Sequence, residues 1–98
     1  TTHASRYLQQ LCKHWSHKYH TEFDASRGFI DMSLGRAELV AEPDALAVTL
    51  NVNDPEQAER MQHVVATHLD RFAFREAPLP FDSRGNLDPV LFGRKPHE

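Results

Sequence analysis

The sequence predicts one α+β domain, a two-layer sandwich in which two helices pack on one face of an antiparallel β-meander (α-β-β-β-β-α). Three observations indicate this class. Apolar residues recur every three or four positions near both ends of the chain, which is the period of a helix. Between these segments they alternate with polar residues, which is the period of a half-buried strand. Short turn sequences separate the alternating runs, so we expect a sheet whose single apolar face is covered by the helices.

The first helix is expected to begin after Thr2, whose side-chain oxygen can cap it, and to run to about Lys18 or Tyr19. Its apolar residues form one stripe, with Cys12 at the edge. The stripe consists of Tyr7, Leu8, Leu11, Trp15 and Tyr19. We expect this stripe to lie against the sheet.

Four strands are expected to follow, joined by three short turns. The strands are Thr21–Ala25, Phe29–Leu34, Ala37–Glu42 and Leu46–Asn53, and the turns are Ser26–Gly28, Gly35–Arg36 and Pro43–Ala45. Gly28 is expected to take a positive φ in the first turn, because glycine has no Cβ to obstruct it. Consecutive strands with short turns indicate an antiparallel meander with one buried face.

The second helix is expected to start at Asp54-Pro55-Glu56, which supplies a cap, a first-turn proline and an acid near the positive end of the helix dipole. It should run to about Phe74 and stop before Pro78. Its apolar face consists of Ala58, Met61, Val65, Leu69 and Phe72. Residues 1–81 are therefore expected to form the domain, with a possible edge strand at 79–81, and residues 82–98 a weakly ordered tail.

Composition limits the classes of protein to which the chain can belong. Its 98 residues suit one domain, and its net charge of −3 argues against general nucleic-acid binding, which needs a basic surface. No apolar run reaches the roughly 18 residues of a membrane-spanning helix. Because Cys12 is the single cysteine, no intramolecular disulfide can form, which favours a cytoplasmic protein. The chain begins with Thr1 rather than Met, which leaves open whether a leader was removed.

Three segments resemble a known bacterial family, domain-of-unknown-function family 2218. They are ASRYLQQLCKHWSHKY, FIDMSLGRAELVAE and HVVATHLDRFAFRE, and the likeness covers roughly residues 2 to 80. The resemblance implies a small α+β domain associated with iron acquisition and siderophore-interacting proteins, and it supplies no established activity. The chain matches the family's characteristic positions at His14, His17, His68, Arg71, Phe72, Phe74 and Arg75. The segment after Phe81 departs from the family pattern, which often ends in a strand carrying a tryptophan.

The candidate ligand-binding residues are His14, His68, Arg71 and Arg75. His68 lies among apolar neighbours in the second helix, so partial burial should favour its neutral imidazole, which can bind a metal or a hydrogen-bonding partner. The alternative is a core histidine bonded to a backbone carbonyl or to Tyr7. The two arginines, one turn apart, suit a carboxylate or phosphate, although they can also pair with nearby acids.

The candidate metal ligands are His14, His17 and His68. The first two have the i, i+3 spacing that lets imidazoles on one helix approach a common point, and the third joins them if the helices lie side by side. Cys12 points about 140° away from His17 on the helix, so it is not expected to complete the set. The alternative is that these are solvated histidines among the seven of a histidine-rich chain. The sequence indicates no particular cofactor.

We therefore expect a cytoplasmic accessory or binding domain whose pocket between the helices takes a small anion, such as a siderophore arm, or a metal ion. The alternative is a protein-interaction or homodimerisation module. Its surface would be the open sheet face with the tail, and its apolar residues would be Phe29, Leu87, Val90, Leu91 and Phe92. An enzyme is the third class: it would use a histidine base, but the sequence has neither a nucleophile elbow nor a phosphate-binding glycine loop.

Overall fold

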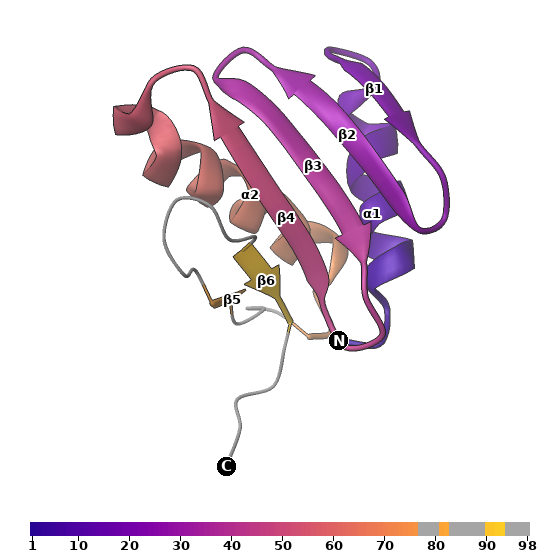
Figure 1. Cartoon of the computed structure of the whole chain (residues 1–98). Coiled ribbons are helices and arrows are strands. Elements are labelled where there is room, and N and C mark those ends of the chain that lie inside the picture. The colour runs from indigo at the N-terminus through magenta and orange to yellow at the C-terminus, as the bar shows by residue number, and fades with distance from the viewer. Residues whose placement is uncertain (77–80, 83–89, 94–98) are drawn as a thin grey trace.

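The computed structural model describes residues 1–76, 81–82 and 90–93, in which a six-stranded antiparallel sheet carries both helices on one face (Figure 1). The elements in chain order are α1 (Ala4–Trp15), β1 (His20–Phe23), β2 (Arg27–Met32), β3 (Gly35–Ala41), β4 (Leu46–Val52), the 3-10 turn η1 (Pro55–Gln57), α2 (Ala58–Phe72), β5 (Phe81–Asp82) and β6 (Val90–Phe92). This architecture confirms the predicted α+β class, the meander and the placement of the helices.

Alternation along the strands decides which face of the sheet is buried. The strand order is β1-β2-β3-β4-β6-β5, and its first four members form the predicted meander. The buried residues that point towards the helices include Ile30, Ala37, Leu39, Leu46 and Val48. Their strand neighbours point the other way, and among the described residues no helix covers that second face (Figure 1).

The C-terminal part of the sheet differs from the expectation of a weakly ordered tail over 82–98. Strand β6 lies between β4 and β5, and Phe92 pairs with Leu46 while Val90 pairs with Val48. The side chain of Phe92 is 1% exposed and belongs to the hydrophobic core. A run of three apolar residues is too short to show a period, and its partner strand lies more than 40 residues earlier in the chain. The expected edge strand at 79–81 begins at Phe81 within the described residues, whereas Leu79 and Leu87 lie outside them.

Both helix boundaries differ from the predicted ones. Helix α1 begins at Ala4, and its N-cap residue is His3, which makes no side-chain capping bond, so the expected cap at Thr2 is wrong. The helix ends at Trp15, and in the turn that follows the backbone N–H groups of Lys18 and Tyr19 both donate to the Trp15 carbonyl. Helix α2 ends at Phe72 instead of about Phe74. Neither helix has the length and apolar character to span a bilayer.

The predicted start signal Asp54-Pro55-Glu56 begins a 3-10 turn that leads into the second helix. The Asp54 side chain accepts a hydrogen bond of 3.0 Å from the Glu56 N–H, as the cap was expected to do. Pro55 stands at the first position of the capped segment. That segment is η1, which leads directly into α2 at Ala58.

Gly28 lies inside β2 and does not take the expected positive φ. The turn before it is built by Asp24, whose carboxylate accepts hydrogen bonds from the Ser26 and Arg27 N–H groups, and these bonds lower the pKa of that carboxyl. Gly28 is needed for close packing instead: a Cβ there would lie 2.6 Å from the Cβ of Phe23 and 3.2 Å from the Sγ of Cys12. The glycine therefore lets α1 approach the sheet.

The start of the chain is joined to the segment after α2 through Glu76. Its carboxylate accepts a hydrogen bond from the Tyr7 hydroxyl and one of 2.9 Å from the Thr1 hydroxyl. Partial burial by itself raises the pKa of Glu76, but the two hydrogen bonds and nearby positive charge outweigh it and lower the pKa below the ordinary value of 4.5. The ionised carboxylate is therefore the form that holds the two segments together.

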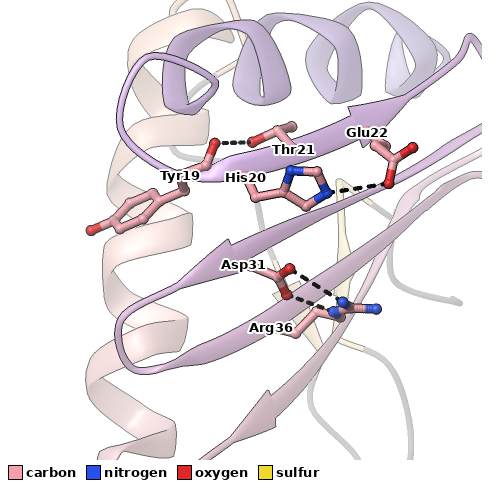
Figure 2. Close-up of polar contacts among 6 residues, drawn as sticks. All are labelled: Tyr19, His20, Thr21, Glu22, Asp31 and Arg36. Carbon is pink, nitrogen blue, oxygen red and sulfur yellow. Dashed lines mark hydrogen bonds and ion pairs between the residues drawn. The ribbon is translucent and has the colours of Figure 1, made fainter.

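The open sheet face carries polar pairs of side chains (Figure 2). Arg36 donates two hydrogen bonds to Asp31, of 2.7 and 3.2 Å, and its guanidinium lies 4.2 Å from the ring centre of Phe29. On β1, His20 and Glu22 form a second polar pair, with His20 Nε2 and Glu22 Oε2 3.3 Å apart. Two polar pairs therefore lie on this face, one within β1 and one between β2 and β3.

We expect Phe92→Ala to lower the free energy of unfolding by about 3–5 kcal/mol, because it removes a fully buried aromatic ring from the core. Urea unfolding followed by circular dichroism measures this loss. Leu91→Ala is the matched control, since Leu91 is half-buried and pairs with Ala47 on the other side of the sheet, and it should cost much less. Equal, small effects of both substitutions would show that β6 contributes little to the fold.

We expect Glu76→Gln to lower stability at neutral pH and to flatten its decline in acid. The pKa of Glu76 is lower in the folded chain than in the unfolded one, so its contribution is complete above about pH 4.5 and is lost as the pH falls through the folded value. Urea midpoints at several pH values between neutral and acid measure this. Glu38→Gln is the control, because exposed Glu38 accepts no hydrogen bond among the described residues. Parallel pH profiles of wild type and Glu76→Gln would contradict the assignment.

Candidate functional site

The two helices lie antiparallel on the sheet, and their exposed line of contact is named here the helix seam. At one end of it, Tyr7 near the start of α1 bonds Glu76 after the end of α2. At the other end, His14 and Trp15 at the close of α1 contact His68 of α2. The residues of α1 along the seam recur every three or four positions, which places them on one face of the helix. They are Arg6, Gln10 and His14, and the N-cap residue His3 precedes them.

A groove of about 470 Å³ occupies the seam at the start of α1. It is lined by His3, Arg6, Tyr7, Gln10, Phe72, Phe74, Arg75 and Glu76. The lining combines aromatic surface with two guanidinium groups, and 72% of Phe74 is exposed. This combination is typical of a site for an anion that has a flat apolar part.

The charge of the groove is positive. Arg6 comes from α1 and Arg75 from the turn after α2, and neither forms an ion pair among the described residues. The one carboxylate of the lining, Glu76, already accepts hydrogen bonds from two hydroxyl groups. The guanidinium of Arg75 lies 5.8 Å from the ring centre of Phe74, so a cation–π contact orients it without neutralising it. Two unpaired arginines on facing segments can bind one carboxylate or phosphate.

A cluster of aromatic rings continues the seam beyond the groove. The ring centres of His14 and His68 are 5.3 Å apart, and those of Trp15 and His68 are 4.7 Å apart. Phe72 lies edge-on to His14, with ring centres 5.7 Å apart, and also lines the groove. Groove and histidine pair are therefore adjacent parts of one surface.

His68 combines features of both of its predicted roles. It is half-buried, and its Nδ1 lies 2.8 Å from the Val64 carbonyl oxygen, which is the backbone bond expected of a structural histidine. A carbonyl only accepts, so Nδ1 carries the proton. In the neutral ring the lone pair is then on Nε2, which remains able to accept a hydrogen bond or bind a metal.

The structure brings together some of the predicted site residues and separates others. His14 meets His68, and Arg75 lines the adjacent groove. Arg71 is exposed and does not line the groove. His17 falls in the turn after α1, because the helix ends at Trp15, and its side chain is exposed. Within the described segments no three histidine, cysteine or acidic side chains are placed to hold one metal ion, so the expected three-histidine cluster does not form there.

Most of the groove was missed from the sequence. Arg6 and Gln10 are polar residues at the edge of an apolar stripe, a position that most amphipathic helices fill with polar residues. Phe74 and Glu76 follow the end of α2, where periodicity carries no information. The spacing of Arg6, Gln10 and His14 is the one available signal, and it acquires meaning only with α2 beside it.

Thiol chemistry finds no support in the structure. The side chain of Cys12 is fully buried between α1 and the sheet, and burial raises its pKa to about 11. The thiol therefore stays protonated at neutral pH, whereas a nucleophilic cysteine needs a lowered pKa.

A second hollow, of about 580 Å³, lies on the open sheet face over β1, β2 and β3. It includes Phe29, which was expected to belong to an interaction surface. Of the other residues expected there, Val90 and Phe92 are buried in the core and Leu91 is half-buried. Burial removes the reason for expecting a tail with exposed apolar residues.

Comparison with known proteins gives a family and a fold. The NMR structure of PA4090 from Pseudomonas aeruginosa is similar to this chain, with 36% sequence identity and a TM-score of 0.63 over 97% of this chain and 91% of that one. No curated protein matches. The family described as "Uncharacterized protein conserved in bacteria (DUF2218)" matches residues 1–82, and the chain therefore belongs to this family.

Proposed function

We propose that this protein is a binding domain for a small anion that carries an aromatic or other flat apolar part, and that the ligand occupies the groove of the helix seam. The observation that carries the proposal is the pair of unpaired guanidiniums, Arg6 and Arg75, beside the aromatic surface of Phe72 and Phe74. Arginine binds carboxylate through two parallel hydrogen bonds, and the rings offer apolar contact.

The size of the groove limits the ligand. Pockets for small molecules commonly hold about 300–1,000 Å³, and the 470 Å³ here lies in the lower part of that range. A single aromatic carboxylate or catecholate fits this volume more readily than a complete multi-armed chelator. The finer proposal, iron or siderophore handling, is therefore that one arm enters the groove while the rest of the molecule stays in solvent.

Location and partners belong to the same proposal. A single buried cysteine suits the reducing cytoplasm, where such a domain would meet an imported anion. A net charge of −3 makes a general nucleic-acid partner a poor fit. The described lining of the groove contains no serine, threonine or cysteine side chain to act as a nucleophile, so we propose binding rather than catalysis.

We expect benzoate and dihydroxybenzoate to bind with saturable heat in calorimetry, and with amide NMR shifts at Arg6, Gln10, Phe72 and Arg75. Arg6→Gln and Arg75→Gln should each weaken binding by about tenfold or more, because each removes a charge-assisted hydrogen bond. A ferric tris-catecholate siderophore, added separately, tests the finer proposal.

Two arginines of α2 serve as controls. Arg60→Gln and Arg71→Gln remove exposed charges of α2 that do not line the groove, so they should leave affinity within about twofold. Equal losses in all four variants would indicate a diffuse charge effect. Absence of saturation with either aromatic acid would refute the proposed ligand class.

A further inference from the structure

We propose that His14 and His68 form a two-histidine site for a divalent transition-metal ion such as zinc, at the end of the helix seam next to the groove. The site has two protein ligands, and water or an anion in the groove would occupy the other coordination positions. This inference does not rest on the proposed anion, because the ion can be added alone.

The first argument is the separation of the rings. Two imidazoles that bind one tetrahedral ion, each with a metal–nitrogen distance near 2.1 Å, have ring centres about 5 Å apart. The observed separation of His14 and His68 is 5.3 Å, with an angle of 48° between the ring planes. The pair therefore has the spacing of shared ligation before an ion arrives.

The second argument is the orientation of His68. Metal-binding histidines usually donate their other ring N–H to a carbonyl or carboxylate, which sets the tautomer and aims the free nitrogen. The bond of 2.8 Å from His68 Nδ1 to the Val64 carbonyl is such a contact. Trp15 packs on the same ring at 4.7 Å between centres and further restrains it.

The third argument is access. His14 is exposed in the last turn of α1, where the helix dipole is negative and favours a cation, and His68 is half-buried beside it. Phe72 lies against His14 and also lines the groove, so an ion held by the pair would face the groove's contents. Neutral imidazoles bring no negative charge, and an anion in the groove would supply it.

The test is a titration of the full chain with zinc(II) alone. Calorimetry and NMR of the imidazole nitrogens measure the binding. We expect saturable shifts at Nε2 of His68 and at the His14 ring. His14→Ala and His68→Gln should each weaken zinc binding about tenfold or more. Loss of a residue that only supports a metal ligand already costs about 10–100-fold in affinity, and loss of the ligand itself costs more. Cobalt(II) absorption in the visible range reports whether the coordination is tetrahedral.

His17→Ala and His63→Ala are matched controls, because both residues are exposed histidines outside the pair, and they should bind zinc as the wild type does. His3→Ala tests whether His3, the histidine nearest the chain start, contributes to zinc binding. Melting temperatures show whether each variant folds, and His14, being exposed, carries the test if His68→Gln unfolds. Unchanged zinc affinity in His14→Ala, or shifts spread evenly over the exposed histidines, would overturn the site.

The same variants separate this inference from the proposed anion site. Arg6→Gln and Arg75→Gln should weaken the aromatic acids and leave the affinity for zinc alone unchanged. His14→Ala should weaken zinc binding, and in the absence of metal it should leave the affinity for the aromatic acids unchanged. Loss of zinc binding in the arginine variants would contradict an independent two-histidine site.

Discussion

The burial of one sheet face under two helices is the constraint on which the rest of this structure depends. The core residues of the meander, such as Ile30, Leu39 and Val48, point to that face, and the stripes of α1 and α2 are buried against them. Gly28 permits α1 to come close, and Phe92 extends the same core beneath β6. Once both helices lie on one face, their outer edges must run side by side, and the helix seam is the consequence.

The seam gathers polar groups that no single element contains. Helix α1 contributes Arg6 and His14, α2 contributes His68, and the turn after α2 contributes Arg75. At one end, Tyr7 and Thr1 hold the Glu76 carboxylate, which keeps the segment after α2 in place. This contact positions Arg75, the neighbour of Glu76, across the groove from α1. A structural hydrogen bond therefore sets the geometry of the candidate binding surface.

The two faces of the molecule differ in how their charges are arranged. On the open sheet face, Arg36 is paired with Asp31 and covers Phe29, so its charge is largely satisfied (Figure 2). Along the groove, Arg6 and Arg75 have no carboxylate partner among the described residues. Unpaired guanidiniums beside exposed aromatic rings mark the helical side as the one with free capacity to bind.

Much of the architecture was determined by the sequence itself. Alternation fixed the inward faces of β2, β3 and β4, and the stripes identified both helices, because local side-chain period depends only on local backbone geometry. The individual histidines and Arg75 were recognisable for the chemistry that their side chains allow. The exact helix ends were not, since the turn after Trp15 depends on backbone hydrogen bonds that residue types specify weakly.

Tertiary structure decided everything that joins distant segments. Strand β6 pairs with β4 across more than 40 residues, and three apolar residues give no sign of that partner. The placement of Arg6 and Arg75 along one groove, and the contact of His14 with His68, required the antiparallel packing of α1 and α2. His17 lies in the turn after the end of α1 and is not part of that pair. Periodicity encodes which side of an element is buried, whereas a binding surface depends on which elements become neighbours, and that is settled only when the whole core packs.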